Sequence, residues 1–253
     1  MEKSKSSKFY RWVDLCKRID AKGDYIRPFR DIVSHYSNPS RFYHTMDHVV
    51  HCLDEFKEAR HLVEHPGEIE MALWLHDVIY DPVVPPKKFD LSKLPPDFLI
   101  SDDSARRLSE GIDNDTFLEW INNLTYPKDN ERRSAQLAYE LTQKMELPDE
   151  FIQRTYDLIF ATAHRDTPDD IDSKIIIDVD LSVLGQPIEI FDKYEENIRK
   201  EFIIVPTERY KKDRTFVLNR FLERESIYHT EFFIDKYELR ARENLERSIA
   251  KLT

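Results

Sequence analysis

The chain has 253 residues, of which 49 are acidic and 38 basic, so its formal net charge is -11. This acidity argues against duplex nucleic acid as a partner over a broad face, whereas a small phosphorylated molecule in a local pocket stays compatible with it. With only four glycines, the chain lacks the tight turns that many short strands require, so the composition favours a mostly helical protein. No apolar run approaches the roughly 18 residues that span a membrane.

The two cysteines, Cys16 and Cys52, lie far apart and in no spacing typical of a metal site. We expect both to be small core residues in a reducing compartment. The first eight residues are polar and basic without an apolar signal core. The sequence therefore predicts a cytoplasmic protein with no membrane partner, and oligomerisation stays open.

Apolar residues recur at helical spacing along most of the chain. We expect helices over 9–20, 24–36, 45–61, 69–76, 130–146, 148–164, 187–203, 206–224 and 230–250. Residues 174–184 are rich in β-branched side chains and would suit a buried strand. Because no second strand-like run exists for it to pair with, we expect a buried helix that stops at Gly185. The sequence predicts one all-α domain over residues 1–253.

Residues 82–128 are expected to form an insertion within that domain. The prolines of residues 81–97 remove amide donors and block helix continuation, so we expect an irregular, mobile loop over 81–99 next to the site. Two short helices are expected over 101–110 and 115–124.

The adjacent pair His76 and Asp77 is the first sign of a functional site. Ile69, Ala72, Leu73 and His76 share one helix stripe, which points His76 toward a core. Burying a carboxylate beside it is costly unless the carboxylate is paired or binds a metal. A core histidine with an exposed aspartate is the alternative interpretation of this pair.

Further candidate ligands lie on other predicted helices. His44, His48 and His51 have the i, i+4, i+7 spacing that places them on one helix face, which suits either a metal site or a polar surface. His164 ends a largely apolar helix, where a histidine is often only a dipole partner. Asp178 and Asp180 lie in the most apolar stretch of the chain, where a solvated face does not explain them.

Taken in order, these residues resemble the HD superfamily of metal-dependent phosphohydrolases. In that family, successive helices supply a His, a His-Asp pair and an Asp. The resemblance covers about residues 10–250 apart from the insertion, and it is carried by five ordered segments, 41–48, 74–82, 129–135, 161–164 and 178–185. It implies a helical HD-type bundle with a proline-rich insertion after the His-Asp helix.

The resemblance also implies a site and an activity. One divalent ion (manganese, magnesium, iron, nickel, cobalt or zinc) would be bound by His48, His76, Asp77 and Asp180. Glu131 and Asp77 would act in catalysis, while the substrate contacts would be Arg41, His44, Asn130, His164 and Asp178. The expected reaction is hydrolysis of a phosphoester or phosphoanhydride in a small phosphorylated metabolite, a nucleotide by family analogy, by metal-activated water.

Two other functions stay open from the sequence. A metal-binding or ligand-sensing module without turnover would use the same residues. A di-iron oxygenase on the same scaffold would need more histidines between Asp77 and Asp180, where the chain has only His164.

Overall fold

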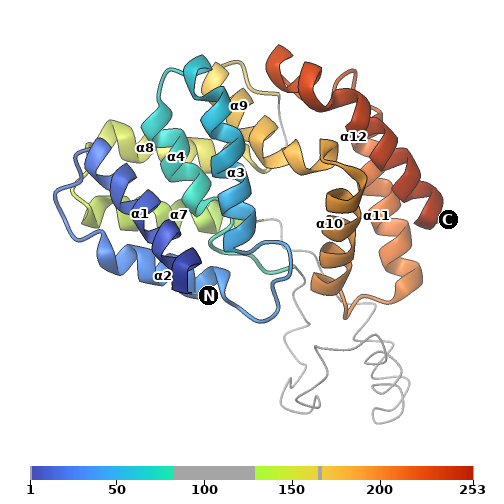
Figure 1. The fold of residues 1–253 in the computed structure, drawn as a ribbon, viewed down its shortest axis with the longest axis horizontal. Helices are drawn as coiled ribbons and strands as arrows, with labels where there is room; N and C mark the ends of the chain where they lie inside the picture. Colours follow the sequence, from blue (N-terminus) through green and yellow to red (C-terminus); the bar gives the residue numbers. More distant parts are fainter. Residues whose placement is uncertain (1, 83–128, 165–166, 253) are drawn as a thin grey trace, which may run out of the picture.

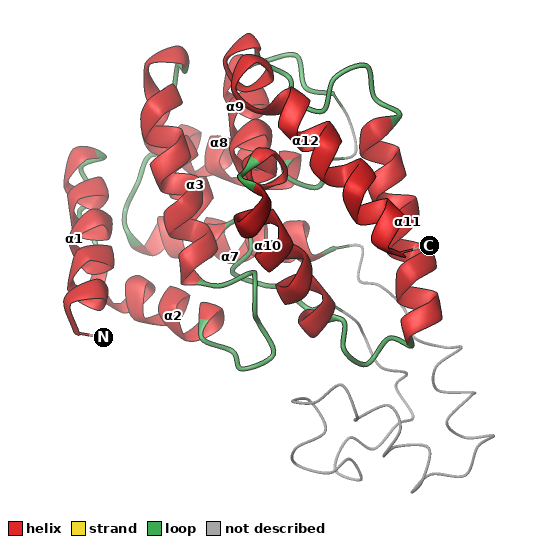
Figure 2. Ribbon diagram, turned by 45° about the vertical axis from the view of Figure 1, so that its right-hand side comes forward, coloured by secondary structure: helices red, strands yellow, loops and turns green. Residues whose placement is uncertain are grey.

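The computed structural model describes residues 2–82, 129–164 and 167–252. Within these ranges the chain is helical and contains no strand (Figures 1 and 2), which confirms the all-α prediction. The α-helices are α1 (Glu2–Arg18), α2 (Ile26–Tyr36), α3 (Met46–Ala59), α4 (Pro66–Leu75), α7 (Asn130–Lys144), α8 (Asp149–Ala161), α9 (Ile171–Leu181), α10 (Ile188–Glu201), α11 (Thr207–Leu222) and α12 (Glu231–Leu252), with short 3₁₀ turns η1 (Arg60–Leu62) and η3 (Ser182–Gly185).

The predicted helices that fall within the described ranges all form, with shifts mainly at their ends. The β-branched segment is indeed a buried helix, α9, which continues into η3 and ends at Gly185. α8 ends at Ala161, three residues earlier than expected, so His164 lies in the turn beyond it. The predictions for the 81–99 loop and for helices at 101–110 and 115–124 fall almost wholly on residues outside those described.

Two helices, α4 and α9, form the centre of the bundle. α4 contacts α1, α3, α7, α8 and α9, and its residues from Met71 to Leu75 are fully buried. α9 is similarly buried over Ile175–Val179. A helix that is apolar on all sides can only be accommodated inside a protein, so the sequence of α4 places its last turn, with His76 and Asp77, next to the core.

α10, α11 and α12 lie together on one side of the molecule, away from α1, α2, α7 and α8 (Figure 1). α12 packs along both α11 and η3. Trp12 and Trp74 meet edge to face at 5.5 Å on the opposite side. The candidate site lies between these two groups of helices, because α3 and the ends of α4 and α9 face α10 there.

Buried and partly buried carboxylates tie the connecting segments to the helices. Each of four side chains, Asp172, Asp178, Glu201 and Glu238, accepts at least two backbone N–H groups from a distant turn. A carboxylate can accept several hydrogen bonds, so one side chain satisfies consecutive amides that have no helical partner. Charge-assisted hydrogen bonds therefore help to hold these turns in place.

Gly185 is required by a close approach between η3 and α12. A Cβ at this position would lie 2.5 Å from the Tyr237 Cβ, an atom fixed by its backbone. We expect Gly185→Ala to lower the free energy of unfolding by about 1–3 kcal/mol, as measured by urea denaturation. The control is Gly67→Ala, whose methyl group would meet two side-chain atoms, the Ile19 Cγ2 at 2.9 Å and the Phe151 Cε2 at 3.4 Å, and no backbone-fixed atom. Equal stability of the two variants would contradict the packing argument.

None of the helices in the described ranges is both long and apolar enough to cross a membrane.

Candidate metal centre

Three helices bring four predicted ligands together. His48 lies in the first turn of α3, which begins at Met46 because the Thr45 hydroxyl caps it and accepts the Asp47 N–H. His76 and Asp77 directly follow α4, and Asp180 lies near the end of α9. Three segments that lie 28 to 132 positions apart in the chain therefore meet at one point.

The distances among the four groups suit a shared ion. The Nε2 atoms of His48 and His76 are 3.1 Å apart. The Asp77 Oδ2 lies 3.4 Å from the His48 Nε2 and 3.1 Å from the His76 Nε2. The Asp180 Oδ1 lies 3.2 and 3.4 Å from the same two nitrogens. Donor atoms bound to one ion at about 2.1 Å are separated by about 3.0–3.4 Å at angles of 90–109°, so the four donors fit a single divalent cation.

The histidine tautomer also suits metal binding. The His76 Nδ1 lies 3.1 Å from the Leu73 carbonyl oxygen. Because a carbonyl only accepts, Nδ1 carries a hydrogen, so the neutral imidazole has its free lone pair on Nε2, which faces the cluster. Backing of this kind by a carbonyl is typical of histidine ligands to metals.

The cluster has a closed and an open side. The side chains of His48 and His76 are each 1% exposed, whereas those of Asp77 and Asp180 are 16% and 17% exposed. The imidazoles thus form the back wall and the carboxylates form the edge that a ligand reaches. This edge is the side from which a substrate would approach an ion held here.

The four groups shift one another's pKa values. Burial alone would lower the pKa of His76, but the charge of Asp77 and hydrogen bonds to both carboxylates hold it well above its usual value. The pKa of His48 is raised in the same way, against burial, by neighbouring groups that include Cys52, Tyr43 and both aspartates. Burial would raise the pKa values of Asp77 and Asp180, but the histidines hold both well below their usual range. Strong opposite shifts in one cluster are typical of functional sites.

Cys52 is a neighbour of the cluster that the sequence did not indicate. It is fully buried one turn after His48, and its sulfur lies with donor atoms of His48, His76 and Asp180 within 4.8 Å of one another. The Sγ is 3.7 Å from both ring nitrogens of His48. A sulfur equidistant from the two nitrogens lies on the plane between them, whereas an ion on Nε2 would lie beyond that atom to one side. The geometry therefore favours Asp77 over Cys52 as the fourth ligand.

Arg41 does not reach the open edge as a phosphate contact would. Its guanidinium is buried and donates to the carbonyl oxygens of Asp77 at 2.8 Å and of Val78 at 3.0 Å. It also lies over the rings of Tyr36 and Tyr80. These contacts satisfy carbonyls beyond the end of α4, so Arg41 fixes the turn that carries His76 and Asp77, and the predicted substrate contact is not supported.

His44 is held between an aromatic ring and a carboxylate. Its ring stacks on Tyr80 with centroids 3.7 Å apart, and its Nδ1 lies 2.7 Å from the Glu201 Oε2. The other oxygen of Glu201 accepts the backbone N–H groups of Phe42, Tyr43 and His44 at 2.8–2.9 Å. Burial would raise the pKa of Glu201, but His44 and these amides outweigh it and lower the pKa. Glu201 at the end of α10 was not predicted, since nothing near it in sequence marks it.

His164 contacts the cluster from the turn after α8. Its Nε2 lies 3.1 Å from the Asp180 Oδ2, the oxygen that faces away from His48. Its backbone has φ of 53°, a conformation that costs energy for a residue with a side chain and that clusters at functional sites. Its Nδ1 is buried without a hydrogen-bond partner in the described part of the chain. His164 thus lies next to a candidate ligand, and its expected role as a substrate contact stays a prediction.

The segment 129–135 mainly anchors the chain that leaves the site. Asn130 bonds through its amide to the backbone N–H and carbonyl of Asp81, and Ser134 does the same for Ile79. Residues four apart on α7 thus match residues two apart on the segment that follows Asp77. The amide of Asn130 is used structurally, which leaves little for the predicted substrate contact. Glu131 is partly exposed and lines a separate pocket with Tyr80 and Arg214.

Asp178 is a structural residue. It is fully buried and accepts hydrogen bonds from the backbone of His229 and Thr230 and from the Thr230 hydroxyl, at 2.7–2.9 Å. Both oxygens are occupied by protein donors, so the predicted substrate contact is not supported. Burial raises the pKa of Asp178 to about 6, even though these donors act to lower it.

We expect Thr230→Val to destabilise the protein by about 1–3 kcal/mol, because the buried carboxylate would lose a donor. The donor favours the ionised form, so the loss should be larger at pH 7 than at pH 5, below the raised pKa. Urea denaturation at both pH values measures it, and metal content should not change. A fall in metal content at unchanged stability would assign the segment to the site instead.

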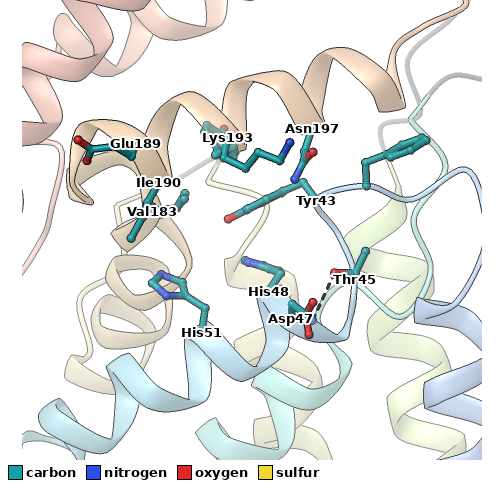
Figure 3. A pocket seen from close by; sticks show the side chains of 12 residues that line it. Tyr43, Thr45, Asp47, His48, His51, Val183, Glu189, Ile190, Lys193 and Asn197 are labelled. Carbon is teal, nitrogen blue, oxygen red and sulfur yellow. Dashed lines mark hydrogen bonds between the residues drawn. The ribbon is translucent and has the colours of Figure 1, made fainter. Parts of the chain in front are cut away.

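A pocket of about 500 Å³ adjoins the cluster at His48. It lies between α3 and α10 and is lined by both polar and apolar side chains (Figure 3), among them Tyr43, His51, Ile190, Lys193 and Asn197. Lys193 and Asn197 lie one turn apart on α10, across from His48 (Figure 3). Tyr43 packs against His48 with ring centroids 4.7 Å apart. The pocket is large enough for a small metabolite next to the candidate ion.

Comparison of the chain with protein-family models, with curated proteins and with solved structures gives no match. The assignment of the site therefore depends on its geometry: a buried cluster of histidine, cysteine and aspartate side chains that could hold a metal ion.

Proposed function

We propose that this protein is a metal-dependent phosphohydrolase that acts on a small phosphorylated metabolite, with a nucleotide as the expected class. One divalent ion would be held by His48, His76, Asp77 and Asp180. The observation that carries the proposal is the convergence of two buried imidazoles and two partly exposed carboxylates on one point. This arrangement is compatible with the HD-type site that the sequence resembles.

The donor set favours hydrolysis over simple storage of an ion. Four protein ligands leave positions free on a six-coordinate ion, and the carboxylate edge is accessible. When bound, such an ion would supply activation of water and neutralisation of charge on a phosphoryl group. His44 and His164 lie beside this edge, next to Asp77 and Asp180 respectively. Two imidazoles there suit a ligand that carries negative charge.

A di-iron oxygenase fits less well. A second ion would need its own ligands, and within the described ranges the one further histidine bonded to the four-ligand cluster is His164. Metal content near one ion per chain would agree with the proposed site, whereas two would favour the oxygenase.

The proposal is tested by phosphate release. We expect turnover of at least one member of a panel of nucleotides and sugar phosphates with one of manganese, magnesium, iron, nickel, cobalt or zinc, and none after chelation. Following the resemblance, Glu131→Gln should lower kcat by about 10²-fold or more at full metal content. Glu140→Gln, on the exposed face of the same helix, is its control. Metal binding without release of phosphate from any substrate would favour the non-catalytic module.

A further inference from the structure

Glu201 makes an unusual set of contacts for a helix-terminal carboxylate. Its side chain is fully buried, yet one oxygen takes three consecutive backbone N–H groups, at residues 42–44, and the other takes the His44 ring. Three successive amides that converge on one oxygen form an anion-binding nest. The last part of the connection between α2 and α3 is therefore bound to the end of α10.

The contact with Glu201 determines which nitrogen of His44 carries the hydrogen. An ionised carboxylate only accepts, so Nδ1 donates to Glu201 in either protonation state of the imidazole. Nε2 has no hydrogen-bond partner among the described residues. A single nitrogen of Arg41 reaches the backbone oxygens of both His44, at 3.4 Å, and Asp77, at 2.8 Å. His44 is thus held close to the Asp77 side of the candidate metal centre.

We propose that Glu201 is the positioning residue of His44. It holds Nδ1 as the donor, so that in the neutral imidazole the Nε2 lone pair is left to accept a proton at the open edge, from water or from a protonated phosphoryl oxygen. The kinetic consequence rests on the proposed hydrolase function, while the orientation of the ring does not. Glu201 itself would not touch the substrate. Tyr80 stacks on the face of the His44 ring and limits the tilt of that ring. The Tyr80 stacking and the Glu201 hydrogen bond together fix both the ring plane and the tautomer.

Glu201→Gln tests this with little change in shape. The amide oxygen can still accept the three backbone amides, but the amide nitrogen then faces the His44 Nδ1 and can only donate to it. The hydrogen of the ring should move to Nε2. Long-range ¹H–¹⁵N spectra of imidazole-labelled protein would show the Nδ1–H form in the wild type and the Nε2–H form in the variant. Turnover should fall about 10²-fold or more, with metal content unchanged.

The chain supplies a matched control at Asp172. This buried carboxylate accepts the backbone N–H groups of Glu64 and His65 and also contacts the His65 Nδ1 at 2.8 Å. It lies eight residues before Asp180 on α9, about 12 Å along the helix. Asp172→Asn should lower the melting temperature to a similar extent but should leave both kcat and the His44 spectrum unchanged.

The outcomes separate the two proposals. A wild-type His44 that carries its hydrogen on Nε2 would overturn the positioning role, as would a Glu201→Gln variant that differs from wild type only in stability. The double variant Glu201→Gln with His44→Gln should lose no more activity than His44→Gln alone. If the protein hydrolyses no phosphoester, the proposed function fails, and the spectra still decide how Glu201 holds the ring.

Discussion

Protein carrying Asp180→Asn is expected to bind divalent metal at least about 100-fold more weakly than the wild type. Mutation of a residue that only hydrogen-bonds to a metal ligand already lowers metal affinity by about 10–100-fold, and loss of a ligand should cost more. The reason is geometric: the Asp180 Oδ1 lies 3.2–3.4 Å from both histidine nitrogens, and an amide supplies no charge to offset the ion. His76→Ala and Asp77→Ala should behave in the same way. Elemental analysis after dialysis and titration with cobalt would measure the loss.

Two controls separate ligation from damage to the fold. Asp178→Asn changes a buried carboxylate two residues earlier on the same helix, and it should lower stability while the metal content stays near wild type. Cys52→Ala should also keep the metal, because the sulfur lies between the two nitrogens of His48 and not beyond Nε2. Loss of metal in the cysteine variant with retention in Asp77→Ala would exchange the roles of these two residues.

Metal affinity is expected to rise with pH by about tenfold or more per unit above pH 6.5, because binding must displace protons from the histidines. In the metal-free protein, the pKa of His76 is raised well above 6.5 by Asp77 and Asp180, and that of His48 is raised by Cys52, Tyr43 and the two carboxylates. The stabilisation from these charged histidines is present in full below pH 6.5 and is lost as pH rises through their raised pKa values.

The carboxylates have the opposite dependence. The pKa values of Asp77 and Asp180 are lowered, so their contribution is present above about pH 4 and is lost as pH falls through the lowered values. With respect to these four groups, the metal-free protein is most stable between about pH 4 and 6.5. The increase in melting temperature on metal addition should therefore grow from pH 6.5 to pH 8.5.

Calorimetric titration in two buffers of different ionisation enthalpy would count the protons released per ion. A release above zero that declines as pH approaches the raised pKa values is the expected result. Affinity independent of pH, with no proton release, would mean that the imidazoles are already neutral without metal and that the ion pairs described above do not form.

The sequence by itself determined the helical class and indicated His48, His76, Asp77 and Asp180, though not Cys52 beside them. Helical periodicity and the scarcity of glycine were enough to predict the helical class, because both signals depend only on local spacing and turn chemistry. His76, Asp77 and Asp180 could be chosen because polar side chains within apolar stretches are costly to bury without a partner. The β-branched run of α9 was assigned correctly for a similar reason: a strand cannot be buried without another strand to pair with.

Only the tertiary structure decided what the remaining polar residues do. Arg41, Asn130 and Asp178 carry the right chemistry for a substrate site, yet their hydrogen bonds go to backbone groups of Asp77, Asp81 and Thr230. No sequence pattern near Glu201 marks it as a site residue, because its partner His44 lies 157 residues away in the chain. Spacing along a helix predicts which residues share a face; it does not predict which unpaired amide or carbonyl of a distant turn will be brought to that face, because that depends on how the helices pack.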